Sequence, residues 1–213
     1  MPCGGGKGNL DFLLRDPGRF HHTRRMRLNA VFVALFLALA ASPAFADQTA
    51  SAKTASSLDR LFGALHATTD PTEANRLTGL IWLIWNHAED PETDRMLTEG
   101  RKAMEQLDLD TALACFNKVV GREPKFAEGW NKRATLYYVM GRYRDSISDI
   151  NHVLALEPRH FGALAGLGMN HEALGDDRRA LNAWRRALKA NPHLEDAQIR
   201  VKALETSLRN QPI

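Results

Sequence analysis

The feature that most restricts the fold of this 213-residue chain is the regular spacing of three prolines. The interval from Pro124 to Pro158 equals the interval from Pro158 to Pro192. If each unit is counted so that its proline is position 32, the units span 93–126, 127–160 and 161–194. A fixed period between about 20 and 50 residues is typical of repeat proteins, in which successive units stack on one another.

The three units also agree in residue type at four further positions. Positions 4 and 24 are large and apolar, whereas positions 8 and 20 are small. The residues are Met96, Trp130 and Leu164 at position 4, Gly100, Ala134 and Gly168 at position 8, Ala112, Ser146 and Ala180 at position 20, and Phe116, Ile150 and Trp184 at position 24. Small residues let two helices approach closely while large ones fill the space beside them. We therefore expect Trp130→Ala or Trp184→Ala to cost about 3–5 kcal/mol of unfolding free energy.

Each unit predicts two antiparallel helices. In the middle unit, Trp130, Ala134 and Tyr137 follow the i, i+4, i+7 spacing of one helix face. Gly141 and Gly175, both at position 15, suit the left-handed conformation that ends a first helix. The proline at position 32 ends the second helix. One pair buries too little surface alone, so stacked pairs share a continuous core.

This pattern resembles that of the tetratricopeptide repeat (TPR) proteins, whose signature is W-x2-L-G-x2-Y…A-x3-F…P. The middle unit matches it at Trp130, Ala134, Tyr137, Ser146, Ile150 and Pro158, and the third unit at Leu164, Leu167, Gly168, Ala180, Trp184 and Pro192. The first unit departs most, with Glu99 at position 7 and Leu107 in place of the turn glycine. The resemblance implies an all-α fold, a right-handed α-solenoid of antiparallel helix pairs. It also implies a concave groove, lined by the first helices, that receives a peptide or a partner's tail.

The segments that flank the repeats predict further helices. Residues 58–92 combine apolar positions with Asp70 as N-cap and Pro71 at the first helical position, and predict a degenerate N-terminal helix pair. Residues 194–213 resemble the capping helix and tail that close such arrays. Residues 47–57, DQTASAKTASS, have almost nothing to bury and predict a flexible linker.

The first 46 residues predict an export leader. Three arginines within 24–27 precede an uncharged run whose most apolar part is 30–41, and Ala-Phe-Ala closes it at 44–46. This order is that of a cleavable signal peptide with its core at 26–46. We expect cleavage after Ala46 and a periplasmic protein with no stable membrane insertion, because a spanning helix needs about 20 apolar residues. The sequence leaves open whether translation starts at Met1 or Met26, and whether export follows the general or the twin-arginine route.

Charge and reactive side chains argue against nucleic-acid binding and against catalysis. The leader holds 6 basic and 2 acidic residues, which leaves 22 basic and 23 acidic residues in the rest of the chain. The remaining chain therefore lacks the basic excess typical of nucleic-acid-binding proteins. Cys115 is expected to be a small buried residue, and no histidine stands at metal-ligand spacing. We predict no enzyme activity, no cofactor and no metal site.

The resemblance places positions 2, 5, 6, 9, 12 and 13 of each unit in the groove. The partner-binding residues that we select there are Arg101, Asn131, Lys132, Thr135, Tyr138, Ala165 and Met169. One TPR subclass grips acidic C-terminal peptides with a clamp of Lys, Asn and Arg, but this chain has Leu97, Gly162 and Gly166 at three of the clamp positions. Arg101→Ala and Asn131→Ala are expected to weaken a partner and to leave the melting temperature nearly unchanged.

The sequence thus predicts an exported, non-enzymatic interaction module of a Gram-negative bacterium. It would bind a protein or peptide in its groove and act as a monomer. The alternative is a structural subunit of a cell-envelope assembly that packs through its outer face or one end. Light scattering distinguishes the two hypotheses, because the alternative requires permanent association.

Overall fold

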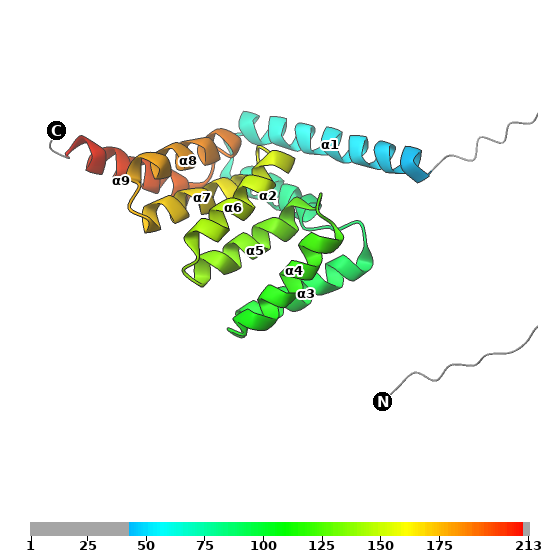
Figure 1. Cartoon of the computed structure of the whole chain (residues 1–213). Coiled ribbons are helices and arrows are strands. Elements are labelled where there is room, and N and C mark those ends of the chain that lie inside the picture. Colours follow the sequence, from blue (N-terminus) through cyan, green and yellow to red (C-terminus); the bar gives the residue numbers. More distant parts are fainter. Residues whose placement is uncertain (1–42, 211–213) are drawn as a thin grey trace, which may run out of the picture. The chain divides into compact units, whose positions relative to one another are not determined.

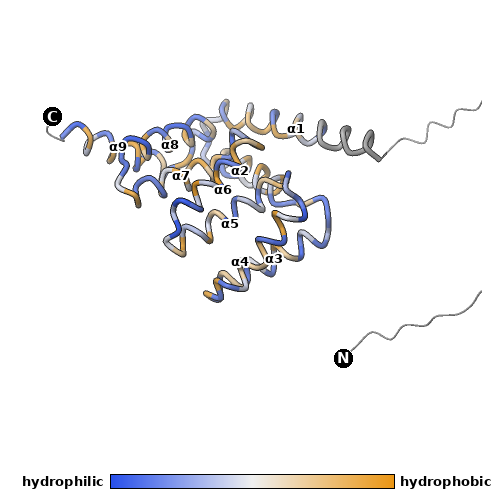
Figure 2. Tube along the Cα trace, viewed as in Figure 1, coloured by the Kyte–Doolittle hydropathy of each residue, from blue (hydrophilic) through white to orange (hydrophobic). Residues whose placement is uncertain are grey.

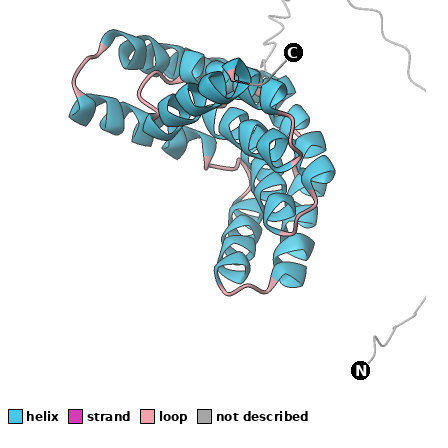
Figure 3. Ribbon diagram, turned by 90° about the vertical axis from the view of Figure 1, so that its left-hand side faces the viewer, coloured by secondary structure: helices cyan, strands magenta, loops and turns pink. Residues whose placement is uncertain are grey.

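The computed structural model describes residues 43–210, and these residues form helices joined by short loops (Figures 1 and 3). The predicted leader lies outside the described residues except for its last four positions. The helices of the described part are α1 (Pro43–Ala67), α2 (Pro71–Trp85), α3 (Pro91–Glu105), α4 (Leu109–Arg122), α5 (Ala127–Val139), α6 (Tyr143–Leu156), α7 (Phe161–Ala173), α8 (Asp177–Ala190) and α9 (Glu195–Arg209). The predicted all-α solenoid of helix pairs is therefore confirmed.

Helices α3 to α8 form three pairs that repeat with the period of the sequence. The second helices of the pairs begin at Leu109, Tyr143 and Asp177, at the same interval as the three prolines. Each pair packs within itself (α3 with α4, α5 with α6, α7 with α8), and successive pairs stack through α4 with α5 and α6 with α7. Helix α9 packs on α8, as the predicted capping helix would. Hydrophilic and hydrophobic residues are interspersed along the helices (Figure 2).

The small and large signature positions meet inside each pair. A Cβ atom at Gly168 would lie 2.6 Å from Cε2 of Trp184, and one at Gly100 would lie 2.6 Å from Cε1 of Phe116. These glycines therefore set the spacing between the two helices. The turn glycines Gly141 and Gly175 adopt φ values of 72° and 73°. Leu107, which replaces the glycine in the first unit, adopts the same left-handed region with a φ of 61°.

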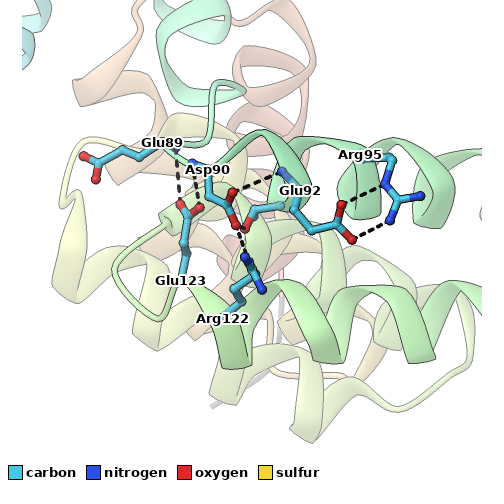
Figure 4. A network of polar contacts seen from close by, with 7 residues as sticks. Glu89, Asp90, Glu92, Arg95, Arg122 and Glu123 are labelled. Carbon is cyan, nitrogen blue, oxygen red and sulfur yellow. Dashed lines mark hydrogen bonds and ion pairs between the residues drawn. The ribbon is translucent and has the colours of Figure 1, made fainter. Parts of the chain in front are cut away.

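A network of polar contacts fixes the start of the first unit (Figure 4). Asp90 caps α3 by accepting a hydrogen bond from the backbone N–H of Glu92 at 3.2 Å. Its carboxylate also pairs with Arg122 in the last turn of α4, and the hydrogen bond from Arg122 lowers the pKa of Asp90. The carboxylate of Glu123 accepts from the backbone N–H of Asp90 at 2.9 Å and of Glu89 at 3.3 Å. The loop before α3 is thus tied to the end of α4.

Helices α1 and α2 form a hairpin, but this hairpin does not extend the stack in chain order. The two helices pack on each other, and no comparable packing joins α2 to α3 within the described residues. Instead, the apolar side chains of α1 and α2 share one core cluster with those of α7, α8 and α9. The rings of Phe62 and Trp85, for example, lie 6.4 Å and 4.9 Å from the ring of Phe161. The predicted N-terminal helix pair exists, but it packs on the third unit.

Polar contacts between residues far apart in sequence fix this hairpin on the third unit. They are His66 Nε2 with the carbonyl oxygen of Lys189 at 2.8 Å, His193 Nε2 with the carbonyl oxygen of Leu65 at 3.1 Å, Asn191 Nδ2 with Thr78 Oγ1 at 3.2 Å, and the ion pair of Arg159 with Asp59 at 2.7 Å. Because each contact joins the hairpin to the segment 159–193, the hairpin closes over one end of the repeat array.

The segment 47–57 differs from its prediction as a flexible linker, because α1 begins at Pro43 and includes it. Residues 53–56 are exposed, so packing does not explain the helix there. The segment is rich in alanine and holds no proline or glycine. Extending a helix that is already anchored at Leu58, Phe62 and Leu65 costs far less than starting a new one. In the region covered by the structure, no helix combines the length and the apolar character needed to cross a membrane.

Candidate functional site

A cleft of about 160 Å³ opens between α5, α6 and α7. The first helices of the units pack side by side, α3 with α5 and α5 with α7, and form what we call the inner face. The cleft lies on this face, where the middle and third units meet. Its lining residues are Asn131, Ala134, Thr135, Tyr138, Ser146, Ile150, Gly162, Ala165, Gly166, Met169 and Asn170.

The structure brings most of the predicted partner-binding residues together. Asn131, Thr135 and Tyr138 of α5 and Ala165 and Met169 of α7 all line the cleft. They lie together because α5 and α7 are the first helices of adjacent units and present equivalent faces. Thr135 and Met169 are exposed, and Met169 has 39% of its surface accessible. The repeat register, read with the groove positions that the TPR resemblance implies, was therefore sufficient to place these five residues around one cleft.

Two predicted residues, Lys132 and Arg101, do not line the cleft. Lys132 is held by an ion pair of 2.7 Å between its Nζ and the carboxylate of Glu128, and Nζ lies 5.9 Å from the centre of the Trp82 ring. Arg101 lies on the exposed surface of α3 in the first unit. Trp82 belongs to the hairpin, whose position was not predicted, and it occupies the space beyond Lys132.

The hairpin limits the cleft at the start of α7. A Cβ atom at Gly162 would lie 2.5 Å from Cη2 of Trp82, so the indole ring rests directly on the backbone of that glycine. The Trp82 ring also packs edge-on against His160 and Phe161, at centroid distances of 5.4 Å and 5.3 Å. Trp82 therefore covers the backbone of Gly162, which is one of the residues that line the cleft.

A hydrogen-bonded chain forms the buried wall of the cleft. Nδ2 of Asn170 donates to Oγ of Ser146 at 2.9 Å and to the carbonyl oxygen of Gly166 at 2.8 Å. Oγ of Ser146 in turn donates to the carbonyl oxygen of Ala134 at 2.8 Å. The chain links α7, α6 and α5 and holds Asn170 in one orientation. Sequence analysis did not select Asn170, although it is a polar residue within the otherwise small and apolar run GALAGLGMN.

Asn131 has a structural role as well as a place in the cleft. It is only 7% exposed, and its Nδ2 donates to the carboxylate of Glu128 at 2.9 Å. The same carboxylate accepts from Nε2 of His160 at 3.1 Å, while Nδ1 of His160 accepts from the backbone N–H of Ala163 at 3.1 Å. Asn131→Ala removes one donor to a buried charge, so the melting temperature is not expected to stay unchanged. This corrects the expectation from the sequence.

The buried Glu128 is ionised in this setting. Burial raises the pKa of its carboxyl, but the hydrogen bond from His160 and the charge of Lys132 outweigh burial, and the net pKa lies below the ordinary value of 4.5. Because Nδ1 of His160 accepts from the backbone N–H of Ala163, Nε2 is the ring nitrogen that donates to the carboxylate of Glu128. The contacts of Glu128 join α5 to the loop before α7, and the side chains of Glu128 and His160 are fully buried.

A second, wider hollow of about 580 Å³ lies between α1, the end of α2 and the loops that precede α5 and α7. None of the seven predicted partner-binding residues lines it. Of the charged residues that line it, Arg159 is paired with Glu157 at 3.1 Å and with Asp59 at 2.7 Å. Because two carboxylates compensate the charge of Arg159, its guanidinium offers no free positive charge to a ligand in the hollow.

The described residues show no grouping typical of a metal centre or of a reactive nucleophile. They contain no cluster of three or more His, Cys, Asp or Glu side chains placed to hold a metal ion. Cys115 is buried, and burial raises the pKa of its thiol. A thiol of this kind is a poor nucleophile.

Comparison with known proteins tests the resemblance of this chain to the tetratricopeptide repeat proteins. A tetratricopeptide repeat family model matches residues 131–193. A TPR repeat-containing protein of Rhizobium etli is 38% identical over 162 residues, which are 76% of this chain and 79% of that protein. The first TPR domain of Spaghetti (RPAP3) has a similar fold, with a TM-score of 0.55, 22% identity and coverage of 58% of this chain and 98% of that one. The TPR2B domain of yeast Sti1 also has a similar fold, with a TM-score of 0.52 and 15% identity. The match covers 55% of this chain and 99% of that domain. The relative from Rhizobium etli shows the family most directly, and this chain belongs to the tetratricopeptide repeat proteins.

Proposed function

We propose that this protein is an interaction module that binds a segment of a partner protein in the inner-face cleft. The observation that carries the proposal is that five residues selected from the repeat register and the TPR resemblance line one hollow; they are Asn131, Thr135, Tyr138, Ala165 and Met169. Two of them, Thr135 and Met169, are exposed and can meet a ligand. The cleft offers surface for binding and no group suited to covalent chemistry, so we assign no catalytic step to it.

Structural relatives give independent support. The Spaghetti TPR domain is bound to the HSP90 peptide SRMEEVD, and the TPR2B domain of Sti1 is in complex with pHsp70. At 22% and 15% identity, these relatives share only the fold with this chain, so binding of a peptide is extended here as part of the proposal. The peptide itself is expected to differ, because Leu97, Gly162 and Gly166 replace three residues of the acidic-peptide clamp.

Selection of peptides tests the proposed site. Short random peptides displayed on phage would be selected against the full chain, and the recovered sequences synthesised for titration calorimetry. Thr135→Arg places a long charged side chain in the cleft and is expected to weaken binding by about 10-fold or more. The matched control is Ser148→Arg, an equally exposed position on α6 that does not line the cleft. Equal affinities of the two variants for every recovered peptide would refute the site.

We further propose that the protein acts as a monomer in the periplasm. The leader sequence supports export. Cleavage after Ala46 would remove the first four residues of α1 and leave in place the residues that anchor this helix in the core, from Leu58 onward. Cell fractionation with N-terminal sequencing tests export, and a mature protein that begins at Asp47 is expected.

Light scattering tests whether the protein is a monomer. An uncleaved protein in the cytoplasm contradicts the first proposal, and a stable oligomer contradicts the second.

A further inference from the structure

One buried acceptor in the wall of the cleft has no partner. Asn170 is 1% exposed, and its Oδ1 forms no hydrogen bond within the described part of the chain. The orientation of the amide is fixed, because Nδ2 donates to the carbonyl oxygen of Gly166, which can only accept. Exchanging the two ends of the amide would bring two acceptors together. Oδ1 is therefore the end without a partner, and it is buried like the rest of the side chain.

A buried acceptor without a donor is costly, and a ligand that supplies an N–H group removes that cost. The walls around Asn170 let a polypeptide backbone come close. Ala165 and Gly166 line the cleft on the α7 side, whereas Gly162 at the start of α7 is covered by the ring of Trp82. A Cβ atom at Gly166 would meet only Cδ1 of Ile150, at an ordinary 3.5 Å, so the backbone of α7 is not crowded there. The unpartnered acceptor and the uncrowded backbone of Gly166 belong to the same wall of the cleft, and because Oδ1 is itself buried, a ligand reaches it only by displacing the atoms that cover it.

The lining of the cleft also limits the charge of its ligand. None of the described residues that line it is Asp, Glu, Lys, Arg or His. The adjacent cation, Lys132, is already paired with the buried Glu128 at 2.7 Å. A carboxylate placed beside Oδ1 of Asn170 would have no positive charge to neutralise it and would face the partial negative charge of that oxygen. A buried charge that is not paired is strongly disfavoured.

We propose that the cleft binds an uncharged, extended segment of the partner, held by one backbone N–H that donates to Oδ1 of Asn170. This inference rests on the proposed function and specifies its ligand. The anchored residue carries a small or aliphatic side chain, which packs on Ala165 and Met169. An acidic residue, such as those in the peptide SRMEEVD bound to the Spaghetti TPR domain, is excluded from this position.

The experiment combines a change in the ligand with a change in the protein. Capped synthetic versions of the peptides selected as described above would be methylated at each backbone nitrogen in turn, which removes one N–H donor at a time. In the wild-type protein, methylation of one particular nitrogen is expected to weaken binding by about 10-fold or more. Asn170→Leu removes the acceptor and keeps a side chain of similar size. In that variant the same methylation is expected to change affinity by less than about 2-fold. Circular dichroism checks that the variant is folded.

Each outcome decides a different statement. A single essential N–H whose effect disappears in Asn170→Leu, within an uncharged sequence, supports the inference. Some peptides could lose binding to Thr135→Arg and yet tolerate methylation of every backbone nitrogen when they bind the wild-type protein. This result would overturn the inference and leave the proposed function standing, and it does not depend on whether Asn170→Leu folds. Recovered peptides that need Asp or Glu at the anchored residue overturn it as well. If Thr135→Arg and Ser148→Arg bind every peptide equally, the proposed function fails first.

Discussion

At the residue scale, two tryptophans at signature positions occupy different environments. Trp184 is 4% exposed and lies against Gly168, whereas Trp130 is half-buried. The ring of Trp130 stacks on His152 with centroids 4.3 Å apart, and its Nε1 donates to the carbonyl oxygen of Pro124 at 2.9 Å. The aromatic at position 4 thus covers the side of its unit, while the one at position 24 fills the interior.

The two alanine substitutions are therefore expected to differ. Trp184→Ala should lower the free energy of unfolding by about 3–5 kcal/mol, because it leaves a large cavity in the core. Trp130→Ala should cost about 1–3 kcal/mol, less than the sequence alone predicts, since the side chain is only partly buried. Urea denaturation of both variants measures the difference. Equal losses of unfolding free energy in the two variants would show that the partial exposure of Trp130 does not reduce its contribution to stability.

The buried carboxylate of Glu128 makes stability depend on pH. Its folded pKa is lowered below 4.5, so the ionised form stabilises the fold above that pH, and the contribution is lost as the pH falls through the folded pKa. Glu128→Gln is expected to cost about 1–3 kcal/mol at neutral pH, because charged hydrogen bonds become neutral ones. The difference from wild type should shrink below pH 4.5. Thermal unfolding across pH measures it.

Glu99→Gln, at an exposed position on α3, is the matched control for Glu128→Gln. It removes one carboxylate and no buried interaction, so its unfolding free energy should follow that of the wild type at every pH. A difference between Glu128→Gln and wild type that stays constant, or grows, towards acid pH would contradict the assignment of an ionised, stabilising Glu128.

At the scale of helices, the α1–α2 hairpin depends on a close approach to α7. Gly162→Ala places a methyl group against the ring of Trp82 and is expected to cost about 1–3 kcal/mol, despite a gain of about 1 kcal/mol in helix propensity. Gly166→Ala, one turn later, meets only Ile150 at 3.5 Å and should be neutral or stabilising by about 0.5–1 kcal/mol. Denaturation measures both variants, and limited proteolysis reports whether the hairpin is released. Equal stability of the two would mean that Trp82 moves aside freely.

The sequence predicts the paired helices well because the information is local to each unit. Gly141 defines a turn within the middle unit, and Gly168 defines a close contact between the two helices of the third unit. Because the pattern recurs with a fixed period, equivalent positions are found in all three units. The position of the hairpin has no such signal. It depends on contacts such as that of Phe62 with Phe161, which are far apart in the sequence and belong to no common repeat. The role of Asn170 was missed for a related reason, because it depends on Ser146 in the preceding unit.

At the scale of the whole array, the third unit has more neighbours than the first. Helices α7 and α8 pack on α6 and α9 and also share a core with the hairpin. Helices α3 and α4 share a smaller core cluster with α5, and no core cluster of the described residues joins them to the hairpin. In a repeat array, local stability follows the interfaces that each unit makes. The third unit should therefore be the most stable part of the chain.

Hydrogen exchange of the backbone amides tests this order. The amides of α7 and α8 are expected to exchange slowest, and those of α3 and α4 faster. Phe62→Ala removes a ring that the hairpin places against Phe161, so it should speed exchange in α7 and α8. Exchange in α3 and α4 should change little, because their core cluster does not include Phe62. If α3 and α4 exchange as slowly as α7 and α8, or if Phe62→Ala speeds all four helices equally, stability is shared evenly along the array. The hairpin would then stabilise all three units, and its position over the third would not set the order of local unfolding.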